Sequence, residues 1–277
     1  MEKLQAALAR AREKRDGTEG GRPVRSDIQP RHRSRRAAQA EATDAAWEAV
    51  AQFDPSTDTL TKSRIFASKV SSDGQHFDIL RTKLLLEMRR NNWTRIAVTS
   101  ATPHCGKTTI SCNLIAGVGR QPEIRGILFD MDFRRPAVGK AFGVQPSASL
   151  EDVLTEAVSF EEQALRLQEN TIISITTAPV PDPAQLMNRS RTAELLDDIQ
   201  QTYRPDIMLF DLPPVLISEE TRAFLKLVDA AIIVAAAEST TVSQIDETER
   251  EVAQYTNVAG IVLNKCRHMD EGYGYTY

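Results

Sequence analysis

The sequence predicts an α/β fold in which a mostly parallel sheet carries helices on both faces. From Thr94 onward, short runs that are apolar along their whole length alternate with amphipathic segments of helical periodicity. A strand that is apolar throughout is buried on both faces, which is typical of a parallel sheet between two helical layers. Three polar motifs follow directly on such strands. Because ligands of open parallel sheets bind beyond the carboxyl ends of the strands, the pattern also predicts where a binding site lies.

Six apolar runs predict the strands, and helical patterns lie between most of them. The strands are expected at residues 96–99, 127–129, 172–175, 207–210, 231–234 and 260–263. The helices are expected at residues 107–117, 149–168, 184–203, 219–227 and 241–255. Another helix precedes the first strand, with apolar residues at helical spacing: Phe77, Leu80, Leu84 and Met88. One face of this helix is therefore expected to pack on the body.

Composition divides the chain into four parts. Residues 1–45 are a basic tail, and we expect them to be disordered because residues 16–40 hold no aromatic residue and few aliphatic ones. Residues 46–93 are expected to be a connector and a docking helix, and residues 94–266 the α/β domain. Residues 267–277 form a short tail that contains tyrosines and is expected to be flexible.

Charge is spread unevenly along the chain. Residues 1–40 hold 11 Lys and Arg against 5 Asp and Glu, a balance of +6, so the total of −4 leaves −10 for residues 41–277. An acidic body argues against a nucleic-acid partner. The basic run at residues 31–36 fits contact with an anionic membrane surface or an acidic partner, and it also fits a solvated tail, the commoner case for so short a run.

The chain shows neither a membrane-spanning nor a secretory signature. No stretch approaches the roughly 18–20 uninterrupted apolar residues of a membrane span, and the amino-terminal segment lacks the apolar core of a signal peptide. The three cysteines, Cys105, Cys112 and Cys266, form neither a disulfide framework nor a spaced metal set. We therefore expect a soluble protein of the reducing cytosol.

A phosphate-binding loop, or P-loop, is predicted between the first strand and the helix that follows it. The pattern is Gly, four residues, then Gly-Lys-Ser/Thr, and this chain has Ala101, Gly106, Lys107 and Thr108 at those positions, followed by Thr109. Backbone amides at the helix start would bind phosphate, Lys107 would neutralise the β- and γ-phosphates, and the Thr108 hydroxyl would bind Mg²⁺. The alternative is an ordinary turn with these residues by chance, and the strand–loop–helix context favours phosphate.

Cys105 in this loop raises a second possibility, a nucleophilic thiol. Such a thiol needs a base, and His104 is adjacent in sequence. Neighbouring side chains in a turn rarely point at each other, so the Gly-Lys-Thr context favours phosphate binding over thiol chemistry.

Carboxylates follow two further strands. Asp130 and Asp132 come at the end of the second strand and project to the same side of an extended segment. One of them suits Mg²⁺ binding, directly or through water, while the other orients or deprotonates an attacking hydroxyl. Asp211 ends a later strand, where a single acid completes a magnesium shell. A lone acid at a strand end is more often a cap or a surface charge, but three in a chain with a P-loop indicate a site.

These segments resemble the Walker A, A′ and B motifs of bacterial tyrosine kinases, which regulate capsule and exopolysaccharide polymerisation and export. The three motifs read Ala101-x-Pro103-x-x-Gly106-Lys107-Thr108, then Asp130-x-Asp132-x-Arg134-Arg135-Pro136, then Asp211-x-Pro213-Pro214. Further matches are Leu80-Arg81-Thr82, Pro181-x-Pro183-Ala184-x-Leu186, Val262-Leu263-Asn264-Lys265 and the terminal Gly272-Tyr273-Gly274-Tyr275-Thr276-Tyr277. The similarity spans residues 77–277.

The resemblance implies an ATP-dependent tyrosine kinase with ATP and Mg²⁺ as cofactors. Lys107 and Thr108 would bind phosphate and Mg²⁺, and Asp211 would support the metal. Asp130 and Asp132 would share the metal and base roles, which the sequence does not divide between them. Arg134 would hold phosphate or an interface.

The terminal tyrosines resemble the family's autophosphorylation cluster. Tyr273, Tyr275 and Tyr277 would be the acceptors, reached by the active site of a neighbouring subunit in a homo-oligomer, although a chance aromatic tail is the alternative. The resemblance also implies the split form of the system, in which a separate membrane protein, a polysaccharide co-polymerase, supplies an activating segment. The chain would then be cytoplasmic and recruited to the inner face of the plasma membrane.

Two departures from the family pattern keep other functions open. His104-Cys105 stands where the family carries Gly-Glu, and the interface motif Glu-x-x-Arg-x-x-Arg is matched here by Gln75, Asp78 and Arg81. These changes suggest a nucleotide-binding regulator of polysaccharide export without kinase activity. A positioning-type ATPase is the other alternative, but its P-loop has an extra lysine that Ala101 and Thr102 do not supply.

Overall fold

The computed structural model describes residues 29–267 and contains one seven-stranded sheet. The strand order is β3-β4-β2-β5-β1-β6-β7, and all neighbours pair in parallel except β3 and β4. The strands are β1 (Arg95–Ser100), β2 (Gly126–Asp130), β3 (Leu165–Gln168), β4 (Thr171–Ser174), β5 (Ile207–Asp211), β6 (Ala230–Ala236) and β7 (Asn257–Asn264). The predicted α/β class with a mostly parallel sheet is therefore confirmed.

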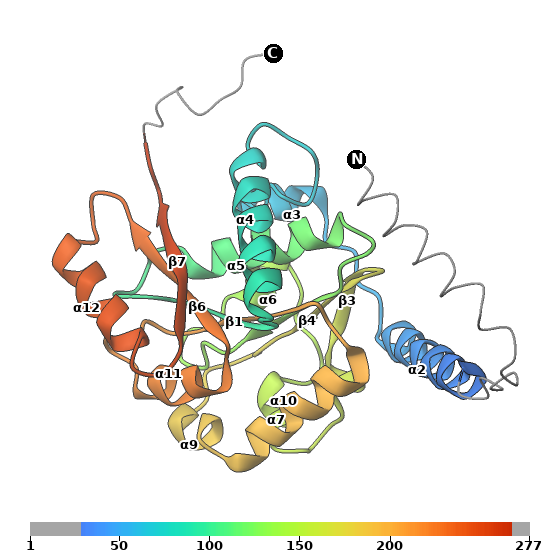
Figure 1. The fold of residues 1–277 in the computed structure, drawn as a ribbon. Coiled ribbons are helices and arrows are strands. Elements are labelled where there is room, and N and C mark those ends of the chain that lie inside the picture. The colour runs from blue at the N-terminus through green and yellow to red at the C-terminus, as the bar shows by residue number, and fades with distance from the viewer. Residues whose placement is uncertain (1–28, 268–277) are drawn as a thin grey trace, which may run out of the picture. The chain divides into compact units, whose positions relative to one another are not determined.

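Helices cover both faces of this sheet, as Figure 1 shows with α4 and α5 above it and α9 and α10 below it. The upper group comprises α3 (Thr57–Lys62), α4 (Gln75–Asn91), α5 (Lys107–Gly119) and α6 (Val138–Phe142). The other helices are α7 (Leu150–Leu154), α8 (Phe160–Gln163), α9 (Pro183–Met187), α10 (Ser190–Tyr203), α11 (Glu219–Phe224) with the 3-10 turn η1 (Leu225–Leu227), and α12 (Val242–Val252).

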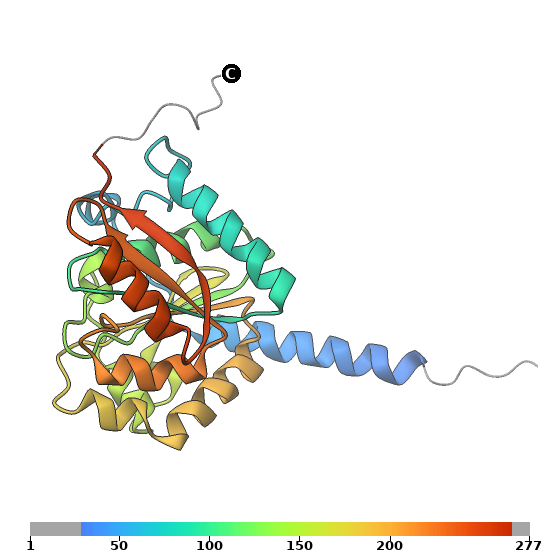
Figure 2. The same ribbon diagram turned by 60° about the vertical axis from the view of Figure 1, so that its left-hand side comes forward.

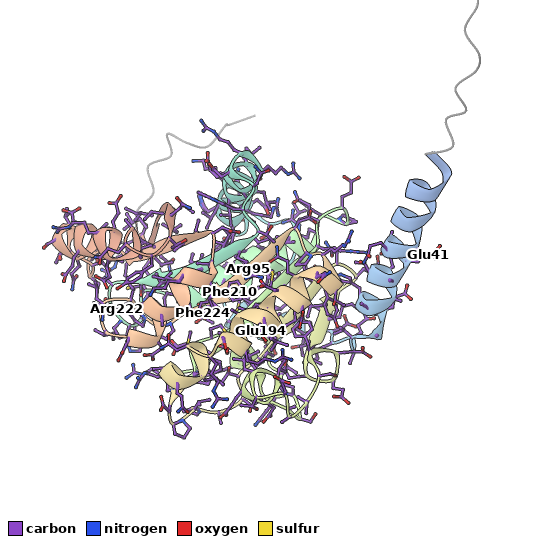
Figure 3. All side chains as sticks on the ribbon, turned by 60° about the horizontal axis from the view of Figure 1, so that its bottom comes forward. Glu41, Arg95, Glu194, Phe210, Arg222 and Phe224 are labelled. Carbon is purple, nitrogen blue, oxygen red and sulfur yellow. The ribbon has the colours of Figure 1, made fainter. Side chains whose placement is uncertain are left out.

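Each face of the sheet has its own apolar core. The first core lies between the sheet and α7 to α12, and it includes Phe129, Phe210 and Phe224. The Phe129 and Phe210 rings stack with centroids 5.0 Å apart, and Phe210 and Phe224, labelled in Figure 3, lie 5.1 Å apart. The second core lies under α3 to α6. Burial on both faces explains why the inner strands are apolar along their whole length.

The sheet edge formed by β7 is only partly covered. Figure 2 turns this strand and α12 toward the viewer. Ile261 is 45% exposed and Leu263 is 60% exposed, whereas every residue of β6 is buried. The register shifts at Ala259, where β7 holds one residue more than β6. Such a bulge increases the local twist of an edge strand and hinders pairing with another chain.

The prediction of disorder over residues 1–45 is wrong from residue 29 onward. Helix α2 spans Gln29–Ala49. Its second half is rich in alanine, the strongest helix former, and contains no glycine or proline. The chain divides into two units at Glu41 and Ala42. Within the second unit, Trp47 is 2% exposed and its indole N–H donates to the Tyr203 carbonyl at 2.7 Å, so packing adds to helix propensity there.

The single helix predicted over residues 149–168 is also wrong. The structure places two short helices, α7 and α8, and the antiparallel strand β3 in this range. Helix α7 is followed by Glu156, whose positive φ of 62° prevents the helix from continuing. Ser159 then caps the start of α8 through a capping box with Glu162. Local caps therefore override the apolar periodicity. None of the helices in residues 29–267 is long and apolar enough to cross a membrane.

Candidate nucleotide site

The phosphate loop occupies residues 101–106, between β1 and α5. Gly106 precedes α5 with φ of 92°, a left-handed conformation that favours glycine. A Cβ atom at this position would lie 2.1 Å from the Asn264 amide nitrogen, which itself donates to the Cys105 carbonyl at 2.9 Å. His104 also has a positive φ of 64°. The loop is thus folded tightly and closed by the end of β7.

Lys107 and Thr108 are the first two residues of α5, and both lie at the carboxyl end of the sheet. Lys107 is 7% exposed. The Thr108 hydroxyl donates to Asp211 Oδ2 at 2.6 Å, and Ser111, one turn later, donates to Asp211 Oδ1 at 3.1 Å. The structure therefore brings together three of the residues that the sequence predicted, with Ser111 as an additional partner.

Asp130 and Asp211 are cross-strand neighbours, because β2 and β5 pair in parallel with these two residues in register. Asp130 Oδ2 accepts from the amides of Ala137 and Val138 at 3.1 and 3.0 Å, while Asp130 Oδ1 is buried and has no hydrogen-bond partner within residues 29–267. Burial, together with the charge of Asp211, raises the pKa of Asp130 well above its ordinary value. Burial also raises the pKa of Asp211 to about 6, against the lowering effects of Lys107 and Thr108.

Asp132 lies two residues beyond the end of β2 and is partly buried. Its carboxylate accepts from the Arg135 amide at 3.0 Å, which folds the loop back on itself. Burial raises the pKa of Asp132, and this rise is opposed by the Arg135 amide and by the charge of Lys107. The charge of Lys107 therefore opposes the rise in pKa at both Asp132 and Asp211.

Arg134, predicted to hold phosphate or an interface, is paired within the chain. Its guanidinium bonds the carboxylate of Glu220 on α11 through Nε and, at 3.4 Å, through Nη2. The arginine side chain is 59% exposed and the glutamate side chain 1% exposed. Glu220 was not predicted as a site residue, because nothing in its sequence context distinguishes it from Glu219.

The donor set fits a magnesium ion. Mg²⁺ prefers oxygen ligands and usually keeps several waters, so it needs only one or two carboxylates from the protein. The Thr108 hydroxyl and Asp211 already lie together, and the orphaned Asp130 Oδ1 belongs to the neighbouring strand end. An unpaired buried carboxylate oxygen is costly unless a ligand completes it. These three residues therefore suit the metal that a phosphate loop uses.

A hollow of about 450 Å³ lies beside the phosphate loop. Its apolar wall comes from α4 and the connector before it and from β7, and Asn264 and Thr109 add polar groups. The lining residues are Arg64, Phe66, His76, Phe77, Leu80, Gly106, Thr109, Ile110 and 262–266. The sequence indicated the α4 residues only as a packing face, because a hollow between distant segments has no local sequence pattern.

The geometry argues against a thiol nucleophile. Cys105 is 1% exposed, and within residues 29–267 its sulfur contacts the Thr102 carbonyl at 3.2 Å and the Thr240 hydroxyl at 3.7 Å. No hydrogen bond joins it to His104 among the described residues, so the base that such chemistry requires is not in place.

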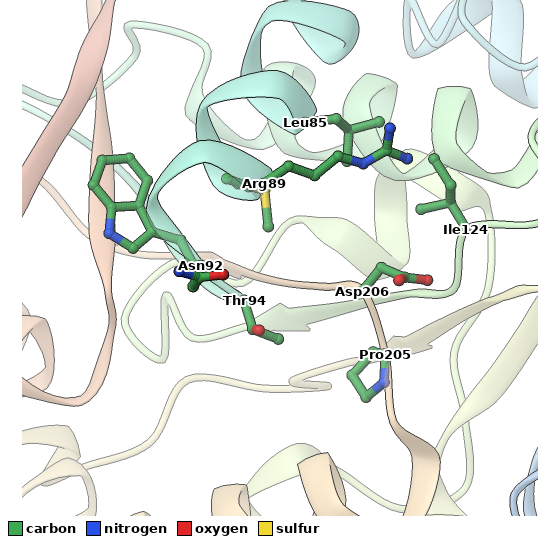
Figure 4. Close-up of a pocket in the computed structure, with 9 residues that line it drawn as sticks. Leu85, Arg89, Asn92, Thr94, Ile124, Pro205 and Asp206 are labelled. Atoms are coloured by element: carbon green, nitrogen blue, oxygen red, sulfur yellow. The ribbon is translucent and has the colours of Figure 1, made fainter. Parts of the chain in front are cut away.

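A second hollow, of about 390 Å³, lies at the amino ends of the central strands (Figure 4). It is lined by the carboxyl end of α4, including Arg89 and Trp93, and by Thr94, Ile124 and Asp206, which come just before β1, β2 and β5. Because ligands of parallel sheets bind at the carboxyl ends of the strands, this hollow is not part of the phosphate-loop site.

No family model matches the chain. Its sequence nevertheless aligns with a Klebsiella pneumoniae protein of the cps region that bears a tyrosine-protein kinase name, at 32% identity over 190 residues, covering 67% of this chain and 26% of that protein. It also aligns with the tyrosine-protein kinase YwqD of Bacillus subtilis, at 25% identity, covering 73% of this chain and 86% of YwqD. The chain is a homologue of bacterial tyrosine-protein kinases.

Solved kinase structures agree with this relationship. The kinase domain of VpsO matches with a TM-score of 0.63 and 25% identity, covering 70% of this chain and 96% of that domain. The kinase domain of the Escherichia coli tyrosine kinase ETK matches in fold, with a TM-score of 0.63 at 23% identity, covering 74% of this chain and 81% of that domain. The chain spans about a quarter of the length of the Klebsiella tyrosine-protein kinase.

The same fold also occurs in proteins that are not named kinases. The septum site-determining protein MinD of Pyrococcus horikoshii, solved with Mg-ADP, matches with a TM-score of 0.54 at 19% identity, covering 64% of this chain and 72% of MinD. The predicted resemblance to bacterial tyrosine kinases is thus confirmed at the level of homology. The predicted acceptors, Tyr273, Tyr275 and Tyr277, lie outside the described residues.

Proposed function

We propose that this chain is an ATP-dependent protein-tyrosine kinase that phosphorylates tyrosines near its own carboxyl terminus and regulates exopolysaccharide polymerisation and export. The observation that carries the proposal is the cluster of Thr108, Asp130 and Asp211 beside a phosphate loop, in a homologue of tyrosine-protein kinases. The same cluster is compatible with any ATPase of this fold. Tyrosine is proposed as the phosphoryl acceptor because the relatives are named tyrosine-protein kinases.

In this proposal the chain's own groups bind and orient ATP. The amides of the loop and of Thr109 hold the β- and γ-phosphates at the start of α5, and Lys107 neutralises their charge. Thr108, Asp130 and Asp211 hold Mg²⁺. The metal, when bound, neutralises charge that develops on the transferring phosphoryl group. The Arg134 guanidinium is paired with Glu220 through two nitrogens, so we assign it no direct contact with phosphate.

The base that accepts the tyrosine proton is assigned to Asp132. Asp130 is buried with one oxygen bonded to two amides, whereas Asp132 is partly exposed and follows it at the mouth of the site. The raised pKa of Asp132 makes it a better proton acceptor than an ordinary carboxylate. This division of roles was open in the sequence, and burial of the two side chains supports it.

The adenine base is proposed to lie in the hollow beside the loop. Phe66, Phe77 and Leu80 give this hollow apolar walls suited to a flat ring, and Asn264 provides an amide for its polar edge. Nucleotide binding would then bring together the connector, α4 and the end of β7.

The proposal also includes the tyrosines that accept the phosphoryl group and the proteins that bind this chain. Tyr273, Tyr275 and Tyr277 are the acceptors, reached from a second copy in a homo-oligomer. The activator is a membrane polysaccharide co-polymerase whose cytoplasmic segment completes the site, which recruits this chain to the inner face of the plasma membrane. No nucleic-acid partner is expected for an acidic body.

The test is incubation with labelled ATP and Mg²⁺, with and without an activating membrane segment. We expect label on the terminal tyrosines that is lost in Lys107→Met and retained in Lys140→Met, a control at an exposed lysine of α6. Phosphate released to water without labelled tyrosine would instead identify a positioning-type ATPase. Nucleotide bound but not consumed would identify a regulator without kinase activity.

A further inference from the structure

A buried carboxylate lies beside the site without belonging to the phosphate-binding groups. The Glu220 side chain is 1% exposed, and its ion pair with Arg134 is its one contact with a cation in the described part of the chain. Both bonds of the pair come from the same guanidinium, through Nε and Nη2. Arg134 is thus the group that compensates this buried charge.

Glu220 is anchored on a fixed element. Its neighbour Thr221 donates to the Pro213 carbonyl at 3.1 Å, and Thr99 of β1 donates to the same carbonyl at 2.8 Å. Arg222, the next residue of α11, pairs with Glu251 of α12 at 2.6 Å. Helix α11 is therefore held to β1, to the segment after Asp211 and to α12, so Glu220 has little freedom to move.

Arg134 belongs to a loop in which Met131 and Phe133 are buried in the core, whereas Arg134 and Arg135 are exposed. The loop of residues 131–137 carries Asp132, whose carboxylate is bonded to the amide of Arg135 inside the same loop. The Phe133 carbonyl accepts from the Val180 amide at 2.9 Å, and the first loop residue, Met131, donates its amide to the Asp211 carbonyl at 3.0 Å. Among the described residues, the pair with Glu220 is the only ion pair that a side chain of this loop makes. Glu220 also contributes to the raised pKa of Asp132, so the two carboxylates lie within electrostatic reach.

Stability does not explain this arrangement. Removing a carboxylate from water costs several kcal/mol, which a single partner seldom more than offsets, and a buried pair replaced by apolar residues is often as stable or more so. The pair does fix geometry, because a guanidinium that bonds through two nitrogens constrains both distance and orientation. Such a constraint is useful where a neighbouring side chain must be held within about 1 Å.

We propose that Glu220 and Arg134 are positioning residues that hold the loop of residues 131–137, and with it Asp132, against the segment that carries Asp211. The inference rests on the proposed function, since it gives Asp132 its role as the base. It adds Glu220, on a different helix, to the groups on which the phosphoryl transfer depends.

The first experiment separates turnover from nucleotide binding. We expect Glu220→Gln and Arg134→Met each to lower kcat for tyrosine phosphorylation by roughly 10- to 100-fold, the effect of a displaced catalytic group. The KM for ATP should stay within about twofold, because Lys107 and the loop amides are untouched. The double variant R134M/E220Q should be no slower than either single variant, because the pair acts as one unit.

Matched controls exclude a general effect of charge. Glu219→Gln removes an exposed carboxylate from the position before Glu220, and Arg189→Met removes an exposed arginine that forms no ion pair in residues 29–267. Both should retain kcat within about twofold. A rise in KM for ATP with unchanged kcat in the Glu220 or Arg134 variants would overturn the proposal.

A fully apolar replacement separates position from stability. In R134M/E220M the buried charge is gone, so we expect the urea midpoint of unfolding to return close to that of the parent. The kcat should remain as low as in the single variants, because no ion pair then orients the exposed part of the loop beside Asp132. Recovery of kcat together with stability would show that the pair is merely structural and would overturn the proposal.

A measurement that does not require catalysis tests the role of the pair independently of the proposed function. Hydrogen exchange of the amides of Arg134, Arg135 and Ala137 should be faster in Arg134→Met than in Arg189→Met, because the exposed part of the loop loses its ion pair with Glu220. If the parent protein labels no tyrosine, the proposed function fails, and faster exchange would still support the anchoring of the loop. Equal exchange in the two variants would overturn the anchoring.

Discussion

At the scale of single residues, the site contains two carboxylates that are buried away from water. Asp130 and Asp211 are fully buried neighbours on adjacent strands, and Lys107 is the cation that acts on Asp211. Two carboxylates so placed resist ionising together, because each raises the cost of charging the other. The folded chain therefore carries an electrostatic cost that a cation bound between the two carboxylates would reduce.

The first prediction concerns Asp211→Asn in the absence of Mg²⁺. Folding raises the pKa of Asp211 to about 6, so between about pH 4 and pH 6 the folded chain binds more protons than the unfolded chain. Stability from this group is therefore present at low pH and lost as pH rises through 6. Asp211→Asn removes the cost of ionisation, and we expect it to be more stable than the parent at pH 8 by up to about 3 kcal/mol.

Urea unfolding at pH 5 and pH 8 measures this effect. The gain from Asp211→Asn should be small at pH 5, where the parent carboxyl is protonated, and Asp198→Asn at an exposed position should show no gain at either pH. A variant less stable than the parent at pH 8 would show that the hydrogen bonds from Thr108 and Ser111 outweigh the cost of burial.

At the scale of elements, the connector before α4 contributes to the site through one buried amide. Asn113 of α5 accepts from the amides of Phe66 and Ala67 at 2.8 and 3.0 Å, and it donates to the carbonyls of Arg64 and Thr109 at 2.8 Å each. These bonds fix residues 64–67 beside the phosphate loop, where Arg64 and Phe66 line the hollow proposed for the base.

The second prediction is that Asn113→Ala both destabilises the fold and weakens nucleotide binding. The buried amides and carbonyl of the connector would lose their partner, and we expect a cost of about 2–4 kcal/mol. ATP affinity should fall as well, because Arg64 and Phe66 are no longer held at the hollow. Urea unfolding and titration with a fluorescent nucleotide check the two effects, with Asn91→Ala, at an exposed asparagine in the last turn of α4, as the control.

This amide also shows what the sequence could and could not predict. The parallel sheet and the convergence of Lys107, Thr108, Asp130 and Asp211 followed from apolar strands with polar groups at their carboxyl ends. Asn113 and Glu220 could not be predicted, because their partners lie 47 and 86 residues away and no local pattern marks them. The helix α2 and the break between α7 and α8 were missed since alanine content and capping residues decided them.

At the scale of the whole molecule, the two units contribute differently to the core. The second unit, which begins at Ala42, contains the sheet, both apolar cores and every described residue of the site. Its first helical turns carry Trp47, whose ring packs edge-on against Tyr203 at 6.1 Å. The predicted tail of residues 1–45 therefore ends a few residues before a structural anchor.

The third prediction follows from this division. A chain that begins at Ala42 should unfold cooperatively, with a free energy of unfolding within about 1 kcal/mol of the full chain, and should bind nucleotide with unchanged affinity. Trp47→Ala in the same shortened chain should cost about 3–5 kcal/mol, because it empties a core position. Urea unfolding measures both. A shortened chain that fails to fold would show that residues before Ala42 are part of the folding unit.

The hydrogen bond from Asn264 to the Cys105 carbonyl joins residues 159 positions apart. On the ribosome, the phosphate loop is synthesised before the strand that closes it, so this hydrogen bond forms only after residue 264 has been added. A nascent protein would therefore have the closed form of its phosphate loop only once β7 has emerged and paired. Incomplete chains that lack β7 would therefore lack the closed loop.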